Sequence, residues 1–127
     1  MRRSANEIAG QVMKAARGAG LPLDVAEDLS LASAALDARA LLSLARDMAD
    51  PARHGALVAA CVEADGACPH SAVARAVVEV IGGRNLGARD VPAETWSVLD
   101  ALAVRTYVPA SDQSRAAGAG AGLSDND

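Results

Sequence analysis

The chain of 127 residues is long enough to form one domain with its own core and too short to form two. Its 12 Lys and Arg residues are outnumbered by 16 Asp and Glu residues, and a net charge of -4 gives no electrostatic reason to bind nucleic acid. No apolar run approaches the roughly 20 residues that cross a bilayer, and none follows the opening Met-Arg-Arg, so we expect no membrane association and a cytoplasmic protein.

Apolar residues make up 51% of the chain, but most of them are small: alanine dominates, Phe is absent and aromatic residues amount to 2%. Alanine favours helices and lets their backbones approach closely, although it buries little area. We therefore expect an all-α protein, a single domain of about six short helices whose thin core is completed in a homo-oligomer. The helical domain is expected to span residues 1–110, and a C-terminal turn with a Gly/Ala-rich tail to span residues 111–127.

Three helices are predicted in the first part of the chain. Ser4 and Glu7 have the spacing of a capping box, which predicts a helix over about 5–17 that ends at the glycines beyond it. Asp24 is expected to cap the second helix, and Asp37 to cap the third. The residues expected to be buried are Val25, Leu29, Ala32 and Leu36 in the second helix and Ala38, Leu41, Leu42, Ala45 and Met48 in the third. This pattern leaves open whether the two are separate helices or one bent helix.

A fourth helix is predicted over about 52–64, because the Asp50-Pro51 pair ends the preceding helix and suits the start of a new one. The residues expected to be buried in it are Leu57, Val58, Cys61 and Val62. Cys61 and Cys68 are expected to be buried free thiols, since an intracellular compartment keeps thiols reduced.

Residues 71–81 fit two kinds of secondary structure. Valines at helical spacing, and an expected ion pair between Arg75 and Glu79, favour a helix, whereas the β-branched run over 77–81 also fits a strand. We expect a helix. The glycines of residues 82–89 predict a loop. A last helix is expected over about 93–107, with Trp96, Leu99, Ala103 and Tyr107 along one edge.

Basic and hydroxyl side chains gather around the proline that follows the last predicted helix. Arg105 and Arg115 flank Tyr107 and Ser111, so a bend there would direct guanidinium and hydroxyl groups at one small anion. Lys14 and Arg17 would join them if the first and last helices pack together. The competing interpretation is a partly buried tyrosine and solvated arginines.

The Gly-Ala-Gly-Ala-Gly run near the end of the chain lacks the Lys-Ser/Thr pair of a nucleotide-binding loop. A simple connector is one interpretation of this tail. The more specific hypothesis is a latch, in which Ser124, Asp125, Asn126 and Asp127 bind a basic or amide-lined pocket of a neighbouring molecule.

The histidines and cysteines do not have the spacing of a metal site. His54, Cys61, Cys68 and His70 would have to converge, and the paired two-residue spacing of structural zinc ligands is absent. We expect no metal and no cofactor.

Two blocks of sequence carry a family resemblance. The first contains Asn6-Glu7-Ile8, Lys14 to Pro22 and Ala26-Glu27-Asp28, and the second contains Arg105 to Ser111, Ser114-Arg115 and Gly118 to Asp127. They resemble the two ends of the bacterial family labelled domain of unknown function 3726. That family has no established activity, so the resemblance implies a family label and no reaction.

We therefore expect a non-enzymatic accessory or interaction protein that binds a partner enzyme or a second copy of itself through its helix faces and tail. One alternative is a small metabolic enzyme of the lyase or isomerase type, with a site near Arg105, Tyr107 and Arg115. A second alternative is a small-anion binding module at the same residues.

Overall fold

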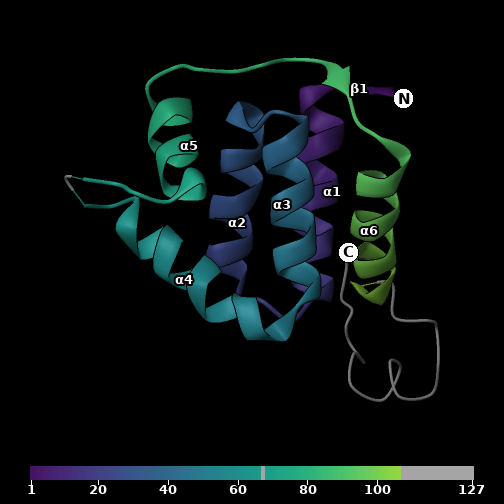
Figure 1. Ribbon diagram of the computed structural model, residues 1–127, viewed down its shortest axis with the longest axis horizontal. Helices are drawn as coiled ribbons and strands as arrows, with labels where there is room; N and C mark the ends of the chain where they lie inside the picture. Colours follow the sequence, from purple (N-terminus) through teal and green to yellow (C-terminus); the bar gives the residue numbers. More distant parts are fainter. Residues whose placement is uncertain (67, 107–127) are drawn as a thin grey trace, which may run out of the picture.

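The computed structural model describes residues 1–66 and 68–106, which form a single all-α domain, as the sequence predicts. Among its six α-helices, α1 packs against α2, α3 and α6 (Figure 1). The helices are α1 (Ala5–Gly18), α2 (Leu23–Ala32), α3 (Ala38–Ala49), α4 (His54–Glu63), α5 (Ala72–Ile81) and α6 (Ala93–Ala103). Short 3-10 turns follow three of them: η1 (Ser33–Ala35), η2 (Pro51–Arg53) and η3 (Val104–Thr106). Two short strands, β1 (Arg2–Arg3) and β2 (Arg89–Asp90), form an antiparallel pair.

Side-chain caps fix the starts of several helices where the sequence predicts them. Ser4 Oγ accepts a hydrogen bond from the Glu7 backbone N–H at 3.1 Å, and the Ser4 N–H donates to Glu7 Oε1 at 3.0 Å, which completes the capping box. Asp37 accepts from the Ala40 N–H at 2.9 Å at the start of α3. The prediction for α2 was wrong by two positions, because Pro22 precedes its first residue and Asp24 lies inside the first turn.

The second and third helices are separate. After η1 the backbone of Leu36 becomes extended, with φ -95° and ψ 124°, and Asp37 then caps a new helix. Leu36 is nevertheless buried, so the chain reverses direction without leaving the core.

The segment that fitted either a helix or a strand is the helix α5. Its start is tied to the end of α4 by Glu63, whose Oε1 accepts from the backbone N–H groups of His70 and Ser71, both at 2.7 Å. These two hydrogen bonds lower the pKa of Glu63. The expected Arg75–Glu79 ion pair does not form.

Arg75 instead donates to the His70 carbonyl, and Glu79 pairs with Arg84 at 3.7 Å. The helix end therefore directs Glu79 toward the following loop and not along its own surface.

Alanines and leucines fill the core together. Ala15, Ala16, Ala26, Ala32 and Ala45 are completely buried, which brings neighbouring helices close together. The large residues that share this core include Ile8, Leu29, Leu41, Leu44, Met48 and Leu99.

The burial prediction was half wrong for α4. Leu57 and Cys61 are buried, but Val58 is 37% exposed and Val62 is 68% exposed. Cys68 is exposed as well, contrary to expectation, while burial raises the pKa of the Cys61 thiol to about 11.

A contact between distant parts of the chain closes the fold. The loop after α5 crosses the molecule to pair with the N-terminal residues (Figure 1), so that Arg2 faces Asp90 and Arg3 faces Arg89. The Arg3 guanidinium then lies 4.0 Å from the centre of the Trp96 ring, a cation-π contact. No helix among the described residues is both long and apolar enough to cross a membrane.

Candidate functional site

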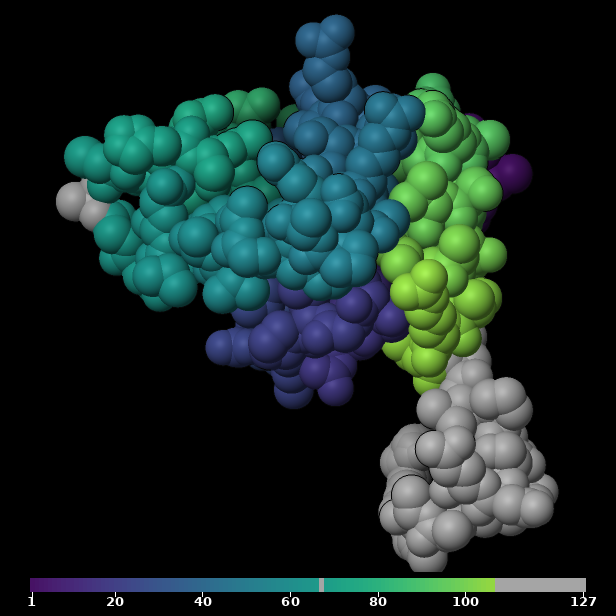
Figure 2. Space-filling model, turned by 60° about the horizontal axis from the view of Figure 1, so that its bottom comes forward, coloured from purple at the N-terminus to yellow at the C-terminus, as the bar shows by residue number. Residues whose placement is uncertain are grey.

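Three basic residues from opposite ends of the sequence meet at one end of the molecule. Lys14 and Arg17 are three residues apart on α1 and therefore lie on the same face of this helix. Lys14, Arg17, Met13 and Thr106 line an open hollow of about 360 Å³, which we call the basic hollow, and Arg105 lies close to it without lining it. Figure 2 shows this end of the molecule from another direction, with η3 at the lower end of the yellow-green helix α6.

Gly18 allows this arrangement. A Cβ atom at this position would lie 1.8 Å from the carbonyl oxygen of Leu102 and 2.8 Å from its carbonyl carbon, so only a glycine permits α1 and α6 to approach so closely. The same position lies 3.3 Å from the Cβ of Arg105. Close packing of the two helices therefore places Arg105 beside Gly18 at the end of α1.

A polar contact holds the same two helices in register. Gln11 Nε2 donates to Asp100 Oδ1 at 3.2 Å, one helical turn before the basic residues of α1. At the far end Thr106 Oγ1 donates to the Ala103 carbonyl at 2.7 Å. The Gln11–Asp100 contact therefore positions α1 against α6, and the Thr106 bond closes the last turn of η3.

The side chains of the basic hollow are accessible to a charged partner. Lys14, Arg17 and Arg105 are all exposed. Arg17 donates one hydrogen bond, from Nη1 to the Leu21 carbonyl at 3.4 Å. A guanidinium carries five N–H donors in a planar fork that matches a carboxylate or a phosphate. Because these groups are solvated, a single ion pair would contribute little, and useful affinity requires several contacts to one anion.

Lys14 and Arg17 were expected to join Arg105 only if the first and last helices pack together. They do, because α1 packs against both α6 and η3. Lys14, Arg17 and Arg105 thus lie at the same end of the domain. The remaining residues of the predicted site and latch fall outside the described residues. They are Tyr107, Ser111, Arg115, Ser124, Asp125, Asn126 and Asp127.

The histidines that were considered as metal ligands have other contacts. His54 Nε2 lies 2.7 Å from the Met48 carbonyl oxygen, and the backbone N–H of His70 donates to Glu63. Within residues 1–66 and 68–106, no three His, Cys, Asp or Glu side chains are grouped so that they could hold a metal ion.

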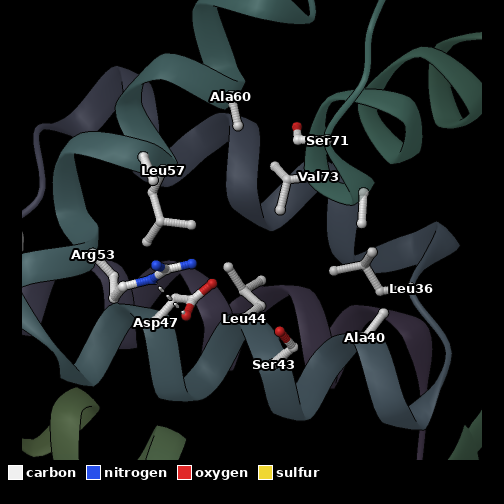
Figure 3. A pocket seen from close by; sticks show the side chains of 12 residues that line it. Leu36, Ala40, Ser43, Leu44, Asp47, Arg53, Leu57, Ala60, Ser71 and Val73 are labelled. Atoms are coloured by element: carbon white, nitrogen blue, oxygen red, sulfur yellow. Dashed lines mark ion pairs between the residues drawn. The ribbon is translucent and has the colours of Figure 1, made fainter.

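A second cavity, which the sequence reasoning missed, lies between α3, α4 and α5. Its volume is about 180 Å³, and buried Leu36, Leu44 and Leu57 form its floor (Figure 3). At one end Arg53 Nε lies 3.5 Å from Asp47 Oδ1. A sequence signal for it exists in the small residues at helical spacing, Ala40 and Ser43 on α3 and Ala56 and Ala60 on α4.

No protein-family model matches the chain, and neither the curated proteins nor the solved structures include a match to it.

Proposed function

We propose that this protein is a non-enzymatic interaction protein whose basic hollow binds an acidic segment, and that this segment is Ser124 to Asp127 in the tail of a second copy. The convergence of Lys14, Arg17 and Arg105 at the end of the domain where the tail begins supports this proposal. Thr106, the last described residue, lines the basic hollow itself.

The charges of the two surfaces are complementary. The basic hollow presents the two cations Lys14 and Arg17, with Arg105 nearby at the end of α1, on a chain whose overall charge is -4, and the proposed occupant carries Asp125 and Asp127. Arginine pairs with carboxylates through two parallel hydrogen bonds, so Arg17 and Arg105 can each hold one aspartate. The residues at the domain surface and the acidic residues of the tail would then neutralise each other.

A second copy is favoured as the source of the tail because exchange makes two latches at once. When two copies exchange identical segments, each latch repeats the contacts of the other, and the second forms at a high effective concentration once the first is made. The single domain also leaves large apolar residues such as Val62 exposed, which a neighbouring copy can shield.

A charge reversal tests this proposal. Sedimentation of the full chain at micromolar concentration should show a dimer or larger species, and Arg17→Glu should convert it to a monomer. Arg39→Glu is the matched control, since Arg39 is an exposed arginine on α3 outside the basic hollow. Reversing both aspartates, Asp125→Lys with Asp127→Lys, should also give a monomer, and combining these changes with Arg17→Glu should restore part of the association.

Two results would overturn the proposal. The first is a wild-type chain that sediments as a monomer, including one that binds only its own tail. The second is an equal effect of Arg17→Glu and Arg39→Glu, because general charge repulsion would then explain both. Added salt should weaken the assembly, since the ion pairs are exposed.

A small-anion binding module is the second candidate, because an anion smaller than a peptide also fits between Lys14 and Arg17. On this hypothesis, a chain truncated before residue 118 should still show a saturable thermal shift with phosphate or succinate, and Arg105→Ala should abolish it. A shift with turnover of the added acid would instead favour the lyase or isomerase alternative.

A further inference from the structure

The pocket between α3, α4 and α5 has the size and lining of a binding site for a small molecule. Leu36, Leu44 and Leu57 are each buried and present their side chains along its floor. Ala60, also buried, forms part of the wall on α4, and Val73 approaches from α5 (Figure 3). The pocket shares no lining residue with the basic hollow, so it is a separate site.

Small side chains on two facing helices create the space. On α3, Ala40, Ser43 and Asp47 recur at intervals of three and four residues and face the pocket. On α4, Ala56 and Ala60 do the same. Larger residues at these positions would let α3 and α4 interdigitate as helices do elsewhere in proteins. Their absence leaves an apolar hollow that opens to the surface beside the exposed residues Ser43 and Ala56.

The volume of this pocket sets the size of its occupant. At about 180 Å³ it is slightly larger than an engineered cavity of about 150 Å³ that binds benzene. A single six-membered ring with one short substituent therefore fills it, whereas a peptide or a helix does not fit. Because the floor is built from leucine side chains, the ring must be apolar.

One polar pair lies at the end of this apolar pocket. The Arg53 guanidinium is held by Asp47 through Nε at 3.5 Å, and Figure 3 shows both side chains at one end, with Leu36 and Ala40 at the other. A cation and an anion side by side attract and repel a bound charge of either sign by similar amounts, so a charged ligand gains no net attraction to offset its lost hydration. They suit a neutral group that accepts a hydrogen bond from Arg53 and donates one to Asp47.

We propose that this pocket binds a compact, uncharged molecule that joins one ring-sized apolar group to a hydroxyl or a primary amide. The ring packs on Leu36, Leu44 and Leu57, and the polar group lies against the Asp47–Arg53 pair. The polar group thereby sets the orientation of the ligand, while burial of the ring supplies most of the affinity.

Titration of the full chain with benzyl alcohol tests this proposal. With ¹³C-labelled leucine methyl groups observed by NMR, the signals of Leu44 and Leu57 should shift saturably, with a Kd on the order of 1 mM for about eight heavy atoms. Benzoate and benzylamine have the same ring and opposite charges, and each should bind at least about fivefold more weakly because attraction by one member of the pair and repulsion by the other nearly cancel, which leaves the desolvation of the ligand charge uncompensated.

Two exposed alanines of α4 provide a matched pair of variants. Ala56→Leu places a side chain in the pocket and should abolish the methyl shifts, whereas Ala59→Leu adds the same side chain outside the pocket and should leave them unchanged. Ser43→Leu fills the pocket from α3 and serves as the second variant if Ala56→Leu does not fold.

The absence of any saturable shift up to the solubility of benzyl alcohol would overturn the proposal. Equal binding by the filled and control variants would also overturn it, since the molecule would then bind elsewhere. Equal affinity for the three benzyl compounds would refute the role of the Asp47–Arg53 pair.

Discussion

Replacement of Gly18 by alanine tests whether the close approach of α1 and α6 builds the basic hollow. The added Cβ would lie 1.8 Å from the Leu102 carbonyl oxygen, a backbone atom that cannot rotate away. The two helices must therefore separate by more than an ångström. Gly10 is the matched control on the same helix, because a Cβ added there meets nothing within 4 Å.

Opposing effects of known size determine the outcome. Alanine in place of glycine inside a helix stabilises it by about 0.5–1 kcal/mol. Overpacking of a well-packed contact destabilises by about 1–3 kcal/mol, and a clash with backbone belongs at the upper end of this range. Gly10→Ala should therefore gain about 0.5–1 kcal/mol, and Gly18→Ala should lose about 2 kcal/mol, so that the two variants differ by about 3 kcal/mol.

Urea unfolding followed by the fluorescence of Trp96, the only tryptophan, measures this difference directly. Gly18→Ala should also weaken the tail-dependent association, because it moves Arg105 away from α1. If Gly18→Ala is as stable as Gly10→Ala, the two helices do not approach this closely, and their packing does not bring Arg105 to Lys14 and Arg17.

Two further predictions concern the junction between α4 and α5. Glu63 has a lowered pKa because it accepts backbone hydrogen bonds from Ser71 and His70. Its contribution to stability is therefore present above the ordinary carboxyl pKa of 4.5, and it is lost as the pH falls through the lowered pKa of the folded state. Glu63→Gln should therefore flatten the acid dependence of the melting temperature below pH 4.5, and an unchanged slope would contradict this origin of the shift. In the folded chain, iodoacetamide at neutral pH should alkylate the exposed Cys68 and spare Cys61, whose thiol is buried and has a pKa of about 11. In the variant Cys68→Ser, mass spectrometry should therefore detect labelling only after denaturation. Rapid labelling of this variant in its folded state would refute the burial of Cys61.

Local features of the sequence determined where most helices begin. Each cap depends only on residues within one helical turn, so it can be predicted without tertiary contacts. Examples are the capping box at Ser4 and the N-caps at Asp37 and Ser71. The same is true of the loop after α5, which its glycines predict.

Which side of α4 is buried could not be predicted from local sequence. Leu57 to Val62 is an uninterrupted apolar run, so its periodicity does not distinguish the buried side from the exposed one. Only the position of α4 against α2, α3 and α5 decided that Leu57 is buried and Val62 is exposed.

The sequence by itself determined the all-α class, the starts of α1, α3 and α5 and the basic character of Lys14, Arg17 and Arg105. Tertiary structure alone decided that these residues meet, that the N-terminal strand pairs with residues 89–90, and that small residues on α3 and α4 leave a pocket. The physical reason is the range of the interactions. Caps and helical periods depend on neighbours along the chain, whereas a hollow depends on how closely two helices pack, which at Gly18 is set by a carbonyl group of a residue far away in the sequence.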